Sequence, residues 1–264
     1  MKYRYFIYLS YKGTHYHGWQ IQPNSITVQE VLNRCLSMLL KEEIYCIGAG
    51  RTDTGVHAPC FYAHFDSHIA ELEKEQQFLY KINCILPKDI ALHDLISVVP
   101  EAHARFDAVS RTYLYRISQA KNPFTIEYTM QYTKTLNIKN MSIASDILKE
   151  YTDFTSFSKL HTDVKTNNCK ISQAIWEVHG SELHFIITAD RFLRNMVRSI
   201  VGTLIEVGSG KISPNEISNI IEKKDRKEAG TSVDASGLHL IKIEYPYITL
   251  NHNDLLSSSN FFLT

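Results

Sequence analysis

A loop that holds three glycines in eight residues, at positions 48–55, constrains the fold of this chain more than any other segment. Apolar residues come directly before it, at 45–47, and shortly after it, at 60–62. Such apolar runs are typical of buried strands, so the loop is predicted to join two of them. Glycine adopts positive φ freely and lets a backbone pass close to a ligand, which favours a functional loop.

The loop also places one carboxylate, Asp53, between an arginine and a histidine. Arg51 is near enough in the sequence to hold Asp53 ionised at neutral pH, and an acid held in this way is typical of a catalytic group. The alternative interpretation is a tight turn with a surface ion pair. His57 has no nucleophile paired with it in the sequence and is predicted to be structural.

Regular patterns predict the elements around this loop. Alternating residues over 3–11 indicate a half-buried strand. A capping box at Thr27 and Glu30, followed by apolar residues at helical spacing, predicts a helix over about 27–41. The first hundred residues therefore have a β-α-β-loop-β character.

The second half of the chain repeats this organisation loosely. Strands are predicted near 112–117, 169–178, 183–188 and 238–247, and helices near 141–151, from 193 to about 208, and from 213. Ser213 and Pro214 are assigned to the cap and first turn of the last helix. No low-complexity linker separates the halves. The predicted fold is α/β (α+β): a central, mostly antiparallel sheet flanked by helices, with related subdomains at 1–105 and 106–264 sharing that sheet.

Composition excludes several classes of protein. The 264 residues are 44% hydrophobic, as in ordinary soluble globular proteins. No apolar run approaches the roughly 20 residues that a membrane span needs, and the N-terminus does not resemble a signal peptide, so a cytoplasmic protein is expected. The five cysteines never form C-x-x-C pairs and imply neither a disulfide framework nor a zinc site.

Charge is balanced overall but unevenly distributed. Lys plus Arg and Asp plus Glu number 28 each, which gives no support for a strongly basic binder. Arginines nevertheless gather beside aromatic residues, and those at 191, 194 and 198 are predicted on nearly one face of a helix. Tyr113 and Tyr115 alternate between Arg111 and Arg116. Alternating tyrosines are more typical of a core strand, but aromatic and guanidinium groups together also hold an unstacked base.

Two other interpretations of the glycine loop fit less well. Asp53-Thr54-Gly55 is the tripeptide of aspartic proteases, whose chemistry needs two carboxylates that share a proton. This chain has one such tripeptide, and Arg51 favours full ionisation of its carboxylate. The sequence also lacks the remaining residues of a phosphate-binding loop, so no nucleotide cofactor is expected.

Residues 50–57, G-R-T-D-T-G-V-H, resemble the G-R-T-D-A-G-V-H signature of TruA-type tRNA pseudouridine synthases. The resemblance covers nearly the whole chain, because further motifs of that family follow in order. They are Y-x-G-W-Q at 16–20, S-V-Q-E within 25–30, N-x-x-L-P-x-D-I at 83–90, H-A-R-F through R-x-Y at 103–113, D-F-x-S-F at 153–157, F-L-x-x-M-V-R at 192–198 and G-L-x-L at 237–240.

The resemblance implies a homodimer of the pseudouridine synthase fold that isomerises uridine to pseudouridine in the anticodon stem-loop of tRNA, at about positions 38 to 40, without metal or cofactor. By position in the motifs, Asp53 is the catalytic aspartate and nucleophile, and Tyr113 stacks on the target base. Arg198 pairs with Asp53, and Arg51 helps the base enter the site. The remaining substrate-binding residues are expected to be the other arginines of these motifs, Arg105, Arg111 and Arg194.

Three departures from the family pattern bear on this interpretation. Thr54 stands where the family has alanine, and its hydroxyl is predicted to be within reach of the Asp53 carboxylate. Thr231 and Asp234 replace prolines that the family usually has. The alternative function is an RNA-binding paralogue, or a synthase that acts on a different RNA or position.

Overall fold

The computed structural model describes residues 1–159 and 166–248. The first half is a four-stranded antiparallel sheet in the order β2-β3-β1-β4. Its strands are β1 (Tyr3–Tyr11), β2 (Ile47–Gly48), β3 (Ala58–Ser67) and β4 (Ile90–Val98). The predicted strand at 3–11 is confirmed. The glycine loop joins two strands as predicted, although β2 contains only two residues.

Two helices cover the first sheet, α1 (Val28–Leu40) and α2 (Phe78–Ile85). Helix α1 begins where the capping box predicts, because the Thr27 hydroxyl accepts a hydrogen bond from the Glu30 N–H. It ends at Lys41, which adopts a left-handed conformation with φ of 57°. The apolar stripe of α1 packs into a core with the buried side chains of β1 and β3.

The second half has its own sheet, in the order β6-β5-β8-β7, with β9 also paired to β5. Its strands are β5 (Ser110–Ser118), β6 (Met130–Gln131), β7 (Ile171–His179), β8 (Glu182–Ala189) and β9 (Leu238–Glu244). All pairs are antiparallel except β5 with β6. The helices are α3 (Ile138–Leu148), α4 (Met196–Gly208) and α5 (Glu216–Glu222), and α3 packs on β7 and α4. Short 3₁₀ turns lie at Gly13–His15, Leu72–Lys74, Thr155–Phe157 and Ala235–Gly237.

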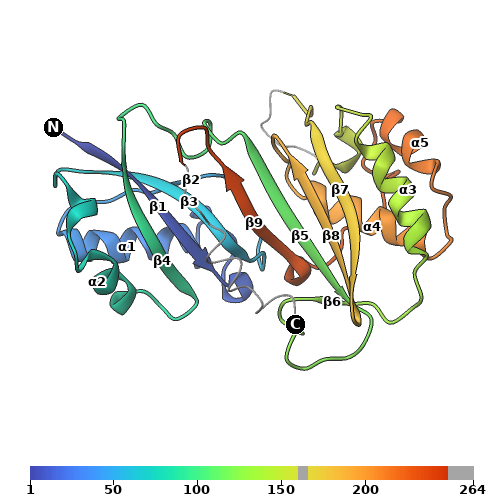
Figure 1. The fold of residues 1–264 in the computed structure, drawn as a ribbon, viewed down its shortest axis with the longest axis horizontal. Helices are drawn as coiled ribbons and strands as arrows, with labels where there is room; N and C mark the ends of the chain where they lie inside the picture. Colours follow the sequence, from blue (N-terminus) through green and yellow to red (C-terminus); the bar gives the residue numbers. More distant parts are fainter. Residues whose placement is uncertain (160–165, 249–264) are drawn as a thin grey trace.

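The two halves lie side by side, with β9 crossing between them (Figure 1). Instead of the one shared sheet that the sequence predicts, the hydrogen bonds among the described residues form two sheets, which a bridge between His57 and His239 joins. There the His57 N–H donates to the Leu238 carbonyl at 3.0 Å, and the Leu240 N–H donates to the His57 carbonyl at 2.9 Å. Side chains of β9 also pack in the first core, so the boundary between 1–105 and 106–264 stays a prediction.

Two helix starts differ from the prediction. Helix α4 begins at Met196 because Asn195 before it has φ of 66°, so Arg191 and Arg194 lie ahead of the helix and not on its face. Helix α5 begins at Glu216, after a turn over 213–215, so Ser213 does not cap it.

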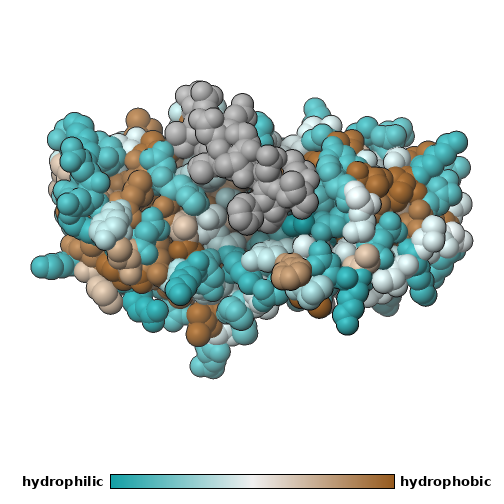
Figure 2. Space-filling view, turned by 60° about the horizontal axis from the view of Figure 1, so that its bottom comes forward, coloured by the Kyte–Doolittle hydropathy of each residue, from teal (hydrophilic) through white to brown (hydrophobic). Residues whose placement is uncertain are grey.

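Polarity differs across the molecular surface. Hydrophobic residues gather on the left of the face in Figure 2, with a smaller group toward its upper right, and hydrophilic residues are frequent along its lower edge. No helix in the part of the chain that the structure describes is long and apolar enough to cross a membrane.

Candidate active site

The three glycines at 48–55, from the end of β2 through the loop that leads to β3, have different environments. Gly55 has φ of 82°, the left-handed region that glycine favours. Gly48 gives room for Trp19, whose ring a Cβ at this position would approach to 2.5 Å. Gly50 faces open space, with nothing within 4 Å of where a Cβ would lie. Positive φ is therefore required at only one of the three positions.

The Y-x-G-W-Q segment at 16–20 packs against the glycine loop. Gly18 has φ of 83°, and a Cβ there would lie 2.2 Å from the Thr52 carbonyl oxygen. The Gly55 N–H donates to the Tyr16 carbonyl at 3.3 Å, and the Tyr11 and Thr52 hydroxyls are 2.9 Å apart. These contacts fix the backbone on both sides of Asp53.

His57 is a structural residue, as predicted. Its Nδ1 accepts a hydrogen bond from the Gly13 N–H at 3.1 Å, so Nδ1 carries no proton. Its Nε2 then donates to the Glu127 carbonyl at 2.9 Å. Burial lowers the pKa of His57, which is consistent with a neutral ring. The ring stacks on His239 with centroids 4.9 Å apart and ties the glycine loop to β9.

Asp53 lies between two guanidinium groups. Arg198 Nη1 is 3.5 Å from one carboxylate oxygen, and Arg194 Nε is 3.8 Å from the other. The pairing of Arg198 with Asp53 that the resemblance implies is thus present in the structure. Arg51 is exposed and makes no ion pair with Asp53 in the described part of the chain, so the cation nearest to Asp53 in the sequence is not one of the two that lie beside its carboxylate.

Arg198 is held in place by the segment 229–237, which lies against α4. Its Nε donates to the Val233 carbonyl at 2.7 Å, and the Val233 N–H donates to the Arg198 carbonyl at 3.2 Å. The segment approaches α4 at Gly202, where a Cβ would lie 1.9 Å from the Thr231 carbonyl oxygen. Asp234 follows, and its own carbonyl accepts a hydrogen bond from the Tyr115 hydroxyl at 2.8 Å.

Tyr113 lies on β5 at the junction of the two cores. Phe192 packs against its ring in a T-shaped arrangement, with centroids 5.1 Å apart. Burial raises the pKa of the Tyr113 hydroxyl to about 12, and Arg111 and Asp53 act on it through their charges, in opposite directions. The ring is therefore neutral at physiological pH and lies within electrostatic range of the carboxylate.

Arg111 and Arg105 occupy different environments. Arg111 donates four hydrogen bonds, all to backbone carbonyls, at Ala49, Arg105, Ala108 and Asp190. It thereby joins the glycine loop, the turn that carries Arg105, and the end of β8. Arg105 is exposed, and burial of part of its side chain together with the charges of Arg51 and Arg191 lowers its pKa. The roles predicted for Arg105 and Arg111 in substrate binding stay predictions.

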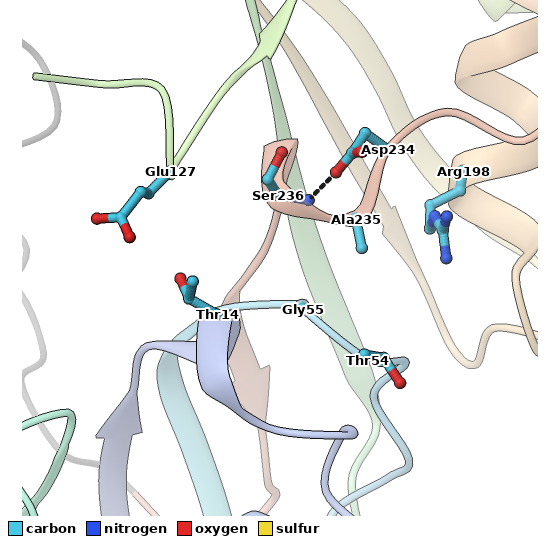
Figure 3. Close-up of a pocket in the computed structure, with 8 residues that line it drawn as sticks. All are labelled: Thr14, Thr54, Gly55, Glu127, Arg198, Asp234, Ala235 and Ser236. Atoms are coloured by element: carbon cyan, nitrogen blue, oxygen red, sulfur yellow. Dashed lines mark hydrogen bonds between the residues drawn. The ribbon is translucent and has the colours of Figure 1, made fainter. Parts of the chain in front are cut away.

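A pocket of about 340 Å³ opens beside Arg198. Its lining comes from five separate segments: Thr14 of the first 3₁₀ turn, Thr54 and Gly55 of the loop, Glu127, Arg198 of α4, and Asp234 to Ser236 (Figure 3). The Ser236 N–H donates to the Asp234 carboxylate at 2.8 Å, and this bond, together with the charge of Arg198, lowers the pKa of Asp234.

Thr54 lines this pocket and makes no side-chain hydrogen bond among the described residues, so its predicted contact with Asp53 is not formed. The described residues contain no group of three or more histidine, cysteine or carboxylate side chains that could hold a metal ion.

Sequence patterns did not single out two residues at this site. Glu127 lies on an irregular segment and forms an ion pair with Lys12, with a separation of 2.6 Å. Phe192 is within a recognised motif but shows no pattern that points to Tyr113. Both reach the site through tertiary contacts that no local spacing reveals.

Comparisons with known proteins show which family this chain is similar to. Residues 151–246 match the family model described as tRNA pseudouridine synthase. Curated proteins named tRNA pseudouridine synthase A are similar over most of the chain. The protein from Parabacteroides distasonis is 52% identical over 244 residues, which cover 92% of this chain and 96% of the relative. The protein from Bacillus subtilis is 37% identical over 241 residues, which cover 90% and 97%.

These matches, on a fold consistent with them, define an isomerase, the enzyme class of pseudouridine synthases. More specifically, the chain belongs to the tRNA pseudouridine synthase family.

Proposed function

We propose that this protein isomerises uridine to pseudouridine in the anticodon stem-loop of tRNA, at about positions 38 to 40, with Asp53 as the nucleophile. The observation that carries the proposal is the carboxylate of Asp53 held 3.5 Å from Arg198 and 3.8 Å from Arg194, within electrostatic range of the Tyr113 ring. The relatives named tRNA pseudouridine synthase A support tRNA as the substrate.

The reaction breaks the bond between uracil N1 and ribose C1′ and forms a bond between uracil C5 and C1′. The proton on C5 is lost and N1 gains a proton, so the isomerisation neither oxidises nor reduces the nucleoside and needs no redox group. A carboxylate can act as a nucleophile toward either the sugar or the base and is released when the new bond has formed. Arg198 and Arg194 place their guanidinium groups beside this carboxylate, at 3.5 and 3.8 Å.

The target uridine must leave its stack before Asp53 can reach it. Unstacking costs a few kcal/mol, which contacts in the protein must offset. Tyr113 supplies an aromatic face, and its neutral hydroxyl adds no charge that would repel phosphate. Arg51 and Arg105 are exposed near the loop, and we propose that they contact the RNA backbone as the base enters.

We further propose that the protein is a cytoplasmic homodimer that works without a metal ion or a nucleotide cofactor. A cytoplasmic location follows from tRNA as the proposed substrate.

The test is tritium release from unmodified tRNA labelled at uracil C5, with wild type and Asp53→Ala side by side. We expect wild type to release tritium and Asp53→Ala to release none, while both bind tRNA. Sequencing of the modified tRNA then identifies the uridine. Binding without release by wild type would contradict the proposed reaction and favour an RNA-binding paralogue or another RNA substrate.

A further inference from the structure

A series of aromatic rings runs from the first core to the surface beside the glycine loop. Phe6 and His64 are fully buried and stack with centroids 5.8 Å apart. His103 packs on His64 at 4.7 Å, and Phe106 packs on His103 at 4.2 Å. Phe106 ends the series with 74% of its surface exposed to solvent. An apolar ring that a protein holds outside its core is free to contact a ligand.

The turn that carries Phe106 is held rigid by hydrogen bonds. His103 Nδ1 accepts from the N–H groups of Arg105 and Phe106, at 3.1 and 3.3 Å. The Asp107 carboxylate accepts from the His103 N–H at 2.7 Å and from the Tyr247 hydroxyl at 2.7 Å. A ring presented on so constrained a turn loses little freedom when a ligand packs on it, which favours binding.

A cationic side chain lies beside the exposed ring, and two further arginines lie near that cation. The Arg105 guanidinium lies 5.7 Å from the centre of the Phe106 ring. Arg51 and Arg191 are close enough to Arg105 for their charges to lower its pKa. An aromatic face among guanidinium groups matches a nucleotide, whose base stacks while its phosphate pairs with the cations.

We propose that Phe106 and Arg105 form a stacking site for an unpaired nucleotide of the bound RNA, separate from the base that is isomerised. This inference rests on the proposed function, because it assumes an RNA substrate. Arg111 fixes the spacing between the two sites, since one guanidinium bonds the Arg105 carbonyl at 2.7 Å and the Ala49 carbonyl of the catalytic loop at 3.2 Å. The second nucleotide therefore helps to select which uridine reaches Asp53.

Substitutions at Phe106 test this site, because they distinguish stacking on an aromatic ring from simple apolar contact. Phe106→Ala and Phe106→Leu both remove the ring, whereas Phe106→Trp keeps an aromatic face. A stacked base contributes about 1–3 kcal/mol, so we expect the Kd for unmodified tRNA to rise about 5- to 150-fold in the first two variants. Phe106→Trp should stay within about threefold of wild type. Because Phe106 is exposed, all three should melt within about 2 °C of wild type.

Tyr80→Ala is the matched control, because Tyr80 is an aromatic residue with 73% exposure on α2 and has no ring or cation contact among the described residues. We expect its Kd to be that of wild type. In tritium-release assays, Phe106→Ala should raise KM and leave kcat within about threefold. A purely structural role would instead lower the melting temperature and kcat together.

Two results would overturn the stacking site: a wild-type Kd for Phe106→Ala, or a wild-type Kd for Phe106→Leu. If wild type releases tritium while Phe106→Ala binds normally, only this inference fails. If wild type releases no tritium but Phe106→Ala and Phe106→Leu lose RNA binding, the stacking site stands and the proposed isomerase function fails.

Discussion

Replacing Asp53 by asparagine tests the site most directly, because the change removes one charge and keeps the shape of the side chain. The carboxylate touches Arg198 at 3.5 Å and Arg194 at 3.8 Å, and its side chain is 25% exposed. Ion pairs this long and this accessible contribute about 0–1 kcal/mol each to folding. We therefore expect Asp53→Asn to lower the melting temperature by no more than about 4 °C.

The effect on turnover should be far larger than the effect on stability. Loss of a nucleophile typically lowers kcat by about 10⁴-fold or more. The affinity for tRNA should not fall with turnover, because both guanidinium groups lose their carboxylate partner and become available to RNA phosphates. We expect the Kd for tRNA to be unchanged or lower than that of wild type.

Single-turnover tritium release measures the chemical step, and filter binding measures the Kd on the same tRNA. Asp234→Asn is the matched control, because Asp234 also lies within electrostatic range of Arg198, and the same change removes the same charge. Asp234→Asn should keep turnover within about tenfold of wild type. Turnover by Asp53→Asn within tenfold of wild type would refute the nucleophile assignment, as would equal losses in the two variants.

Three further predictions follow from the geometry. Arg198→Lys keeps the charge but loses the Nε–H donated to the Val233 carbonyl, so kcat should fall about 10- to 100-fold with tRNA binding retained; wild-type kcat would contradict this. Gly18→Ala places a Cβ 2.2 Å from the Thr52 carbonyl oxygen at φ of 83°, so chemical denaturation should show a loss of more than about 1 kcal/mol. Burial lowers the pKa of His239 to about 3, below the unfolded value of about 6.5, so the unfolded chain binds the proton more readily. The contribution of His239 to stability should therefore fall by about 1.4 kcal/mol per pH unit as pH decreases below about 6.5, and His239→Gln should remove this part of the dependence in melts from pH 7.5 to 5.

Local patterns predicted helices and strands well where the sequence carries a clear helix cap or a clear strand alternation. The strand at 3–11 and the helix that begins after Thr27 are formed as predicted, because hydrogen bonds and side-chain spacing within one segment determine both. Local patterns failed before α4, where apolar spacing suggested a longer helix. The left-handed conformation of Asn195 ends that pattern, and its side chain bonds Ser232, which is 37 residues away.

The candidate site shows the same contrast between what local patterns predict and what tertiary contacts decide. The sequence singled out Asp53 from its loop, but the cation nearest in sequence, Arg51, is not the one that pairs with it. Arg198 pairs with Asp53 only because the segment around Val233 lies against α4 and accepts the Arg198 Nε–H. A contact between residues 145 positions apart leaves no periodic trace in a single sequence.

The sequence by itself determined the family, the identity of the carboxylate and most of the secondary structure, because these depend on residue types and short spacings. The tertiary structure alone decided that the strands form two sheets meeting at His57 and His239. It also decided that Arg194, together with Arg198, lies beside Asp53 and that the ring of Phe106 stands outside the core. The physical reason is that pairing and burial are set by the packing of distant segments, which local propensity does not encode.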